Sequence, residues 1–281
     1  DIIIICLPTP LRKNKTPDMK YVFNCAKKIK KNLNKNTLLV LESTVYPGAT
    51  EEFLGKIFSD FELIGKDFFV SYSPERENPG DKNFNYKKTP KIVGGFTEKC
   101  KKLSIELYSH IVKKVIPVSS IKVAELTKLH ENIYRAINIG LVNEMKIVAD
   151  RMGIDIYEVI SAAKTKPFGF NAYYPGPGLG GHCIPIDPFY LSWKAKKYNI
   201  ETRFIELAGE INHFMPKWVV NKVSGNLKRI NKRFKNLKVL VLGIAYKKNI
   251  DDTRESPSVE IMDQLRKKGS YIYRITYFLN I

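Results

Sequence analysis

The stretch Asp-Ile-Ile-Ile-Ile-Cys-Leu, residues 1–7, is the first of several short apolar runs separated by helical patterns. The loop Pro8-Thr9-Pro10 follows it at once. A short apolar run that ends in turn residues is typical of a buried parallel strand. Strands alternating with helices predict an α/β fold with a partial, Rossmann-type parallel sheet. The further expected strands are residues 37–41, 68–72 and 91–95, and helical spacing covers residues 20–33 and 51–58.

Polar clusters stand directly after three of these expected strands. They are Pro8-Thr9-Pro10, Glu42-Ser43-Thr44, and the run Ser-Pro-Glu-Arg-Glu-Asn-Pro-Gly at residues 73–80. Ligands of open parallel sheets bind beyond the carboxyl ends of the strands. The sequence therefore predicts a ligand site at this edge of the sheet.

A long helical pattern occupies residues 121–152, and Gly153 is suited to end it. A helix of this length measures about 45 Å, more than one small domain requires. We expect it to connect two domains and to form a dimer surface. Lys128 and Asn132, at i and i+4, share one face of it. Both side chains are donors that suit a developing oxyanion, although a solvated helix face has the same spacing.

The loop Pro-Gly-Pro-Gly-Leu-Gly-Gly-His-Cys-Ile-Pro-Ile-Asp, residues 175–187, carries a cysteine among glycines and prolines. Glycines let the backbone approach a ligand closely, which favours Cys183 as an accessible nucleophile over a buried thiol. A Cys-His hydrolase pair is a poor alternative, because the adjacent side chains of His182 and Cys183 point apart in an extended loop. A metal site lacks a second ligand pair at suitable spacing.

A third α/β unit begins near residue 237, with an expected strand at residues 238–243 and a helix at residues 258–268. Arg254 lies between them, where a guanidinium suits a phosphate or sugar oxygen. The alternative is a capping cluster in which Ser256 or Ser258 starts the helix. The predicted domains are residues 1–118, a truncated Rossmann domain; residues 119–215, a central helical and dimerisation domain; and residues 216–281, a truncated second Rossmann-like domain.

The chain has 281 residues and a formal net charge of +19, from 47 Lys and Arg against 28 Asp and Glu. Such a charge suits nucleic acid or a phosphorylated small molecule. The basic residues are spread along the chain, which favours a general compositional bias over a nucleic-acid site. The cysteines form no C-x-x-C pair and are too few for a disulfide framework, so we expect a cytoplasmic protein with no metal site. The cysteines are Cys6, Cys25, Cys100 and Cys183. No apolar run approaches the roughly 20 residues that span a bilayer, so we expect no membrane contact.

Five motifs resemble, in order, those of the UDP-glucose/GDP-mannose dehydrogenase family. The long cysteine loop is most similar to the branch that oxidises UDP-N-acetylhexosamines, especially UDP-N-acetylglucosamine 6-dehydrogenases. The motifs are Ile-Cys-Leu-Pro-Thr-Pro-Leu (residues 5–11), Glu-Ser-Thr-Val-Tyr-Pro-Gly-Ala-Thr (42–50), Ser-Pro-Glu-Arg (73–76), Glu-Leu-Thr-Lys-Leu-His-Glu-Asn (125–132) and Gly-Gly-His-Cys-Ile-Pro-Ile-Asp (180–187).

The resemblance implies a two-step, NAD-dependent oxidation of the sugar C6 alcohol to a uronate through a cysteine thiohemiacetal and thioester. It implies that Cys183 is the nucleophile, that Lys128 and Asn132 stabilise the oxyanion, and that Asp187 positions water near Thr44. Glu77 is the implied acid/base, with Glu75 as its competitor. The implied cofactor contacts are Pro8, Thr9, Thr44 and Glu75, and the implied substrate contacts are Lys128, Asn132, Gly180 and Arg254.

The sequence also departs from the family pattern. Family members begin with a strand and a G-x-G-x-x-G turn for the NAD pyrophosphate, whereas this sequence starts on a later strand of that sheet. The segment after Lys268 no longer resembles the family. We therefore expect a fragment that lacks the full NAD site, with a UDP-sugar as substrate and a homodimer formed through the long helix. The alternative is a non-catalytic remnant that dimerises or binds nucleotide sugars.

Overall fold

A computed structural model describes residues 1–12, 14–57, 61–78, 85–181, 184–247 and 249–275. The chain forms two compact units. The first unit contains residues 1–132 and 186–201, and the second contains residues 133–185 and 202–281. Within the described residues, no helix is both long and apolar enough to cross a membrane.

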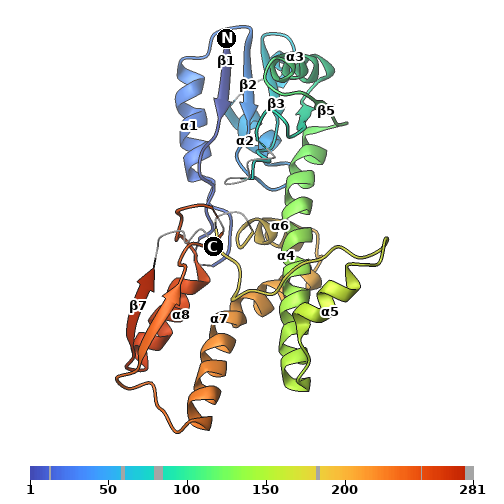
Figure 1. Ribbon diagram of the computed structural model, residues 1–281. Coiled ribbons are helices and arrows are strands. Elements are labelled where there is room, and N and C mark those ends of the chain that lie inside the picture. The colour runs from blue at the N-terminus through green and yellow to red at the C-terminus, as the bar shows by residue number, and fades with distance from the viewer. Residues whose placement is uncertain (13, 58–60, 79–84, 182–183, 248, 276–281) are drawn as a thin grey trace. The chain divides into compact units, whose positions relative to one another are not determined.

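The first unit is built on a five-stranded sheet in the order β1-β2-β3-β4-β5 (Figure 1). The pairs β1–β2, β2–β3 and β4–β5 are parallel, whereas β3 and β4 run antiparallel. All five residues of β2 are buried, which explains their continuous apolar character. The strands are β1 Ile2–Ile5, β2 Thr37–Leu41, β3 Phe68–Tyr72, β4 Lys91–Gly95 and β5 Val115–Pro117.

The sequence predicted the α/β class, the first four strands and a mainly parallel sheet correctly, and the β3–β4 pair is the antiparallel exception. Parallel neighbours need a crossover connection, usually a helix. The described residues between β3 and β4, 73–78 and 85–90, contain no helix. The chain therefore returns in the opposite direction, and the sheet is mixed.

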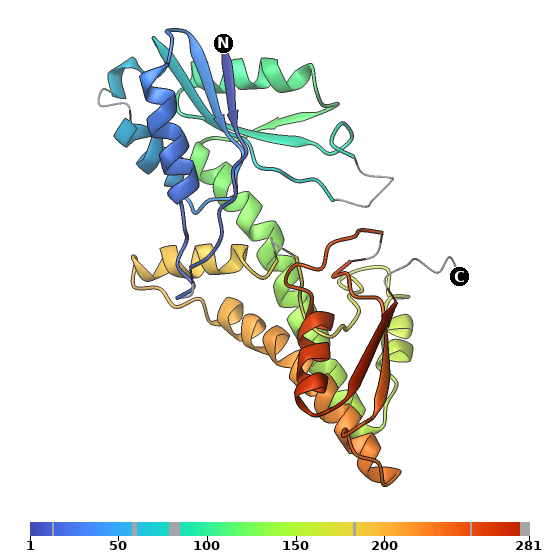
Figure 2. The same ribbon diagram turned by 90° about the vertical axis from the view of Figure 1, so that its left-hand side faces the viewer.

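Three helices and a short turn complete the α/β part of the first unit. Helix α1 packs against α2, while α3 packs along β2 to β5 (Figure 2). Helix α3 was not predicted; the Thr97 side chain caps it by accepting the backbone N–H of Cys100. The bounds are α1 Lys20–Lys31, α2 Ala49–Ile57, the 3-10 turn Phe61–Leu63 and α3 Glu98–Ser109.

Helix α4, Ile121–Met152, matches its prediction at both ends. Its residues up to Asn132 belong to the first unit, as does α6, Asp187–Lys196. The second unit contains the rest of α4 and a two-stranded parallel sheet, β6–β7. Its other elements are α5 Ile156–Ala163, α7 Arg203–Arg229, β6 Lys238–Leu242, α8 Pro257–Lys267 and β7 Tyr271–Ile275.

Helix α7, Arg203–Arg229, continues through a proline. Pro216 lies inside it, although proline removes a backbone hydrogen bond from a helix. Met215, Pro216 and Val220 are all buried. Burial of apolar side chains around the proline offsets the lost bond and carries the helix through.

Candidate active site

Three polar side chains gather in the interior of the first unit. Lys128 and Asn132 lie on α4, and Asp187 is the first residue of α6. All three are buried, and the Nδ2 atom of Asn132 donates to Oδ2 of Asp187 at 2.6 Å. The structure thus brings together a cation, an amide donor and a carboxyl group, from α6 and from the part of α4 that belongs to the first unit.

Asp187 has an unusual acid strength for a carboxyl group. Burial raises its pKa to about 7, while the charge of Lys128 and the hydrogen bond from Asn132 oppose the rise. A carboxyl group with a pKa near neutrality can accept or release a proton under physiological conditions. The cluster therefore combines donors for a negative oxygen with a group that can exchange a proton.

The ends of β1 and β2 are joined by a serine side chain. The backbone N–H of Leu7 donates to Oγ of Ser43 at 2.7 Å, and this hydroxyl donates to the carbonyl of Ile5 at 3.3 Å. Thr44 follows Ser43 and is half-buried. Among the expected cofactor contacts, Pro8 is exposed and Thr9 is half-buried. These residues stand beyond the carboxyl ends of neighbouring strands, as the sequence predicted.

The Ser-Pro-Glu-Arg segment is attached to α4 by its arginine. The Arg76 guanidinium donates to both carboxylate oxygens of Glu131, at 2.6 and 3.2 Å, and to the carbonyl of Pro90 at 2.6 Å. Such a two-pronged pair fixes geometry as well as charge. Because Glu131 precedes Asn132 on α4, this pair fixes the Ser-Pro-Glu-Arg segment next to a residue of the cluster.

The two candidate acid/base carboxylates differ in their surroundings. Glu77 is exposed, whereas Glu75 is half-buried and accepts the backbone N–H of Glu77 at 2.5 Å. The structure does not bring Glu77 into the Lys128, Asn132 and Asp187 cluster. The choice between the two carboxylates stays a prediction.

In the second unit, the glycine loop lies against the segment that carries Arg254. The N–H of Gly181 donates to the Arg254 carbonyl at 3.4 Å, and a Cβ added at Gly180 would stand 2.4 Å from the Cβ of Tyr246. Only glycine fits at this approach. The Arg254 guanidinium is largely exposed and pairs with Asp252 at 2.7 Å.

The sequence offered Ser256 or Ser258 as the residue that caps the helix, and Ser256 is confirmed. The Ser256 side chain accepts the backbone N–H of Ser258 and caps α8. His182 and Cys183 lie outside the described residues, so the prediction for the thiol remains open. Among the residues that are described, no group of three or more His, Cys, Asp or Glu side chains is placed to hold a metal ion.

Sequence reasoning missed a buried charge pair at the end of β2. Glu42 contacts the ammonium of Lys91 on β4 at 2.9 Å and accepts the hydroxyl of Tyr108 on α3. Burial of a carboxylate is costly unless a cation and donors surround it. An acidic residue directly after a fully apolar strand was the available signal.

Sequence models of one family cover most of the chain. The NAD-binding domain of the UDP-glucose/GDP-mannose dehydrogenase family matches residues 1–112, its central domain residues 122–214, and its UDP-binding domain residues 240–275. The chain belongs to the UDP-glucose/GDP-mannose dehydrogenase family. The three matches follow the chain in the order that the motifs indicated.

Individual family members resemble the chain over nearly its whole length. It is 39% identical over 272 residues to protein CapL of Staphylococcus aureus, covering 96% of this chain and 64% of CapL. It is 37% identical to a UDP-N-acetyl-D-glucosamine 6-dehydrogenase of Pseudomonas aeruginosa, covering 94% and 63%. The structure of a UDP-D-ManNAc dehydrogenase from Pyrococcus horikoshii matches with a TM-score of 0.89 and 33% identity, covering 97% and 64%.

The chain spans less than two thirds of the length of these relatives. Their names include both a glucosamine and a mannosamine derivative as substrate, at similar identity. The comparisons therefore establish this family of NAD-dependent UDP-sugar dehydrogenases, and they do not single out the glucosamine branch.

Proposed function

We propose that this chain carries the catalytic core of an NAD-dependent enzyme that oxidises the C6 alcohol of a UDP-N-acetylhexosamine to a carboxylate. The observation that supports this most strongly is the buried cluster of Lys128, Asn132 and Asp187. UDP-N-acetylglucosamine is the substrate that the cysteine loop favours, and UDP-N-acetylmannosamine is its competitor.

The residues at the carboxyl ends of β1 and β2 suit the nicotinamide end of NAD. Pro8, Thr9 and Thr44 retain exposed surface there, and Glu75, which follows β3, is half-buried. NAD, when bound, accepts a hydride from the sugar. None of the expected strands in the sequence is followed by a G-x-G-x-x-G turn that would hold the pyrophosphate. The residues that we assign to NAD therefore suit the nicotinamide part of the cofactor.

The covalent chemistry is assigned to Cys183. Its thiolate adds to the aldehyde carbon, so that a carbon–sulfur bond forms and the carbonyl oxygen becomes negative. Lys128 and Asn132 donate to that oxygen. The hydride of this carbon then passes to a second NAD while the carbonyl re-forms, and the product is a thioester. Water then attacks the thioester carbon, the carbon–sulfur bond breaks, and the uronate leaves.

Asp187 is the group that we assign to water in this last step. Its pKa of about 7 leaves a substantial fraction of the carboxylate free to accept a proton at neutral pH. Because the basic form is the deprotonated one, thioester hydrolysis gains rate as the pH rises through 7. Thr44 is assigned to the same water, and Glu77, with Glu75 as competitor, is assigned to acid/base exchange with the sugar hydroxyl. Gly180 and Arg254 are assigned to the nucleotide sugar.

The proposal is tested by counting NADH against uronate in the enzyme that has the full length of its relatives. We expect two NADH for each uronate formed from UDP-N-acetylglucosamine, with UDP-N-acetylmannosamine as the comparison. A folded protein that yields no NADH with either sugar would favour the non-catalytic alternative. Salt-dependent binding of DNA in place of activity would favour a nucleic-acid partner.

We also propose that two copies of the chain associate through α4. An apolar groove of about 360 Å³ runs between α4 and α7, lined by Ile147, Val148, Leu207 and Phe214. Val148, Leu207 and Phe214 are exposed there, and exposed apolar patches of this kind mark interfaces. Sedimentation velocity should show a dimer that Leu207→Glu converts to a monomer. A wild-type protein that stays monomeric at all concentrations would contradict the proposal.

A further inference from the structure

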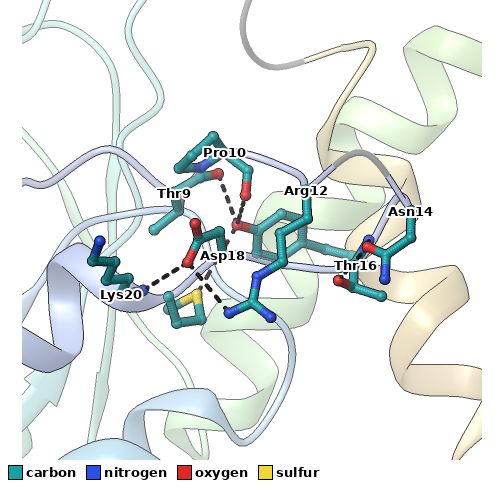
Figure 3. A network of polar contacts seen from close by, with 9 residues as sticks. Thr9, Pro10, Arg12, Asn14, Thr16, Asp18 and Lys20 are labelled. Atoms are coloured by element: carbon teal, nitrogen blue, oxygen red, sulfur yellow. Dashed lines mark hydrogen bonds and ion pairs between the residues drawn. The ribbon is translucent and has the colours of Figure 1, made fainter.

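Tyr190 joins α6 to the loop that follows β1. Its side chain is fully buried, and its hydroxyl donates to the carbonyl of Thr9 at 2.7 Å. The carbonyl of Pro10 lies 3.4 Å from the same hydroxyl. In Figure 3, dashed lines join the carbonyls of the labelled Thr9 and Pro10 to this hydroxyl oxygen. Burial raises the pKa of Tyr190, so the hydroxyl keeps its proton and remains a donor at any working pH.

The loop that Tyr190 holds is internally braced. The N–H of Asp18 donates to the carbonyl of Pro10 at 2.9 Å and closes the base of the loop. Above that base, the N–H of Arg12 donates to the carbonyl of Thr16 at 2.9 Å. The Arg12 guanidinium lies 3.6 Å from the Asp18 carboxylate (Figure 3). Residues 10–12 are therefore hydrogen-bonded to residues 16–18, and the Pro10 carbonyl at the base of the loop also lies beside the Tyr190 hydroxyl.

The same tyrosine stands one helical turn from the proposed water-activating group. Asp187 and Tyr190 are three residues apart on α6, a spacing that places them on the same side of the helix. A single turn of helix thus carries both the carboxyl group that Asn132 contacts and the hydroxyl that fixes Thr9. The backbone bonds of a helix keep such neighbours at a constant separation.

We propose that Tyr190 is a positioning residue that holds the Pro8-Thr9-Pro10 loop, and with it the nicotinamide end of the cofactor, in register with Asp187. This inference rests on the proposed function. The hydroxyl carries the role, because the buried ring would pack in much the same way as phenylalanine. Without the hydroxyl, the Thr9 carbonyl loses its donor and the base of the loop is released.

Tyr190→Phe tests the inference against a matched variant, Tyr72→Phe. Tyr72 is also fully buried, and its hydroxyl has no hydrogen-bond partner within the described part of the chain. Deletion of an unpaired buried hydroxyl costs nothing in hydrogen bonding. In hydrogen exchange, we expect the amides of Arg12, Lys15 and Asp18 to exchange about tenfold faster in Tyr190→Phe alone, the factor for one lost hydrogen bond. Amides of β2 and β3 should not change.

The kinetic arm separates positioning from stability. In the full-length enzyme, we expect Tyr190→Phe to raise KM for NAD about five- to tenfold and to change kcat by less than about twofold. The inference is overturned if hydrogen exchange of the loop amides is unchanged in Tyr190→Phe, or if it changes equally in Tyr190→Phe and Tyr72→Phe. This holds even when the enzyme is active. Faster hydrogen exchange of the loop amides with an unchanged KM for NAD would show that Tyr190 only stabilises the loop. That result would also overturn the inference. A wild-type enzyme without NADH formation would instead reject the proposed function.

Discussion

Cys183→Ser is expected to lower uronate formation by at least about a thousandfold, because a serine hydroxyl stays protonated at neutral pH and cannot replace a thiolate. The first hydride transfer does not use the thiol, so the sugar aldehyde can still form. The aldehyde then has no covalent partner from which the second hydride can leave. The variant should therefore yield at most one NADH for each sugar consumed.

Cys25→Ser is the control for this prediction. Cys25 is half-buried on α1 and is not assigned to the site. Its replacement should leave uronate formation within about twofold of the wild type. Uronate would be measured by chromatography, together with NADH absorbance, in the full-length enzyme. Normal uronate formation by Cys183→Ser would refute the covalent route, since no other step in it forms a thioester.

The sequence predicted those strands that have an apolar run and those helices that have a strong helical period. Strand β2 is fully buried, so its apolar run appears without interruption, and α4 keeps its period from Ile121 to Met152. Helix α3 was missed because the side chains that it buries, Cys100, Ser104 and Tyr108, are small or polar. Strand β7 was missed because most of its residues are exposed and show no apolar run.

The site was predictable only where its residues are neighbours in sequence. Lys128 and Asn132 are one helical turn apart, and their spacing already placed them on one face. Tyr190 lies 181 residues from its partner Thr9, and Glu125 lies 75 residues from its partner Thr50. No local pattern encodes such pairs, because the fold alone decides which distant segments meet.

Glu125→Ala should lower the free energy of unfolding by about 4 kcal/mol at mildly acidic pH. The Glu125 carboxylate is fully buried on α4 and accepts the N–H of Gly48 at 2.5 Å, the N–H of Thr50 at 2.8 Å and the hydroxyl of Thr50 at 2.7 Å. These donors surround the start of α2, where the first amides of a helix have no partner within it. Alanine would leave all three buried donors unsatisfied, each at a cost of about 1–3 kcal/mol before relaxation.

The size of this loss should depend on pH with a defined sign. Burial raises the pKa of Glu125 to about 7, against 4.5 for an exposed glutamate. The folded state therefore binds the proton more tightly than the unfolded state, and the contribution of Glu125 falls as the pH rises from 4.5 to 7. A shift of this size corresponds to about 3 kcal/mol. The difference between wild type and Glu125→Ala should thus be greatest at or below pH 4.5, shrink as the pH rises toward 7, and stay at its smallest value above 7.

Urea unfolding at two pH values measures both effects in the first unit. The chain has two tryptophans, Trp193 on α6 and Trp218 on α7, so a Trp218→Phe background leaves Trp193 as the reporter of the first unit. Glu106→Ala, at an exposed position on α3 of the first unit, should change the free energy of unfolding by less than about 0.5 kcal/mol. A loss below about 1 kcal/mol for Glu125→Ala at both pH values would show that Glu125 does not cap α2. A loss that grew with rising pH would show that its carboxyl is stabilised in the ionised form.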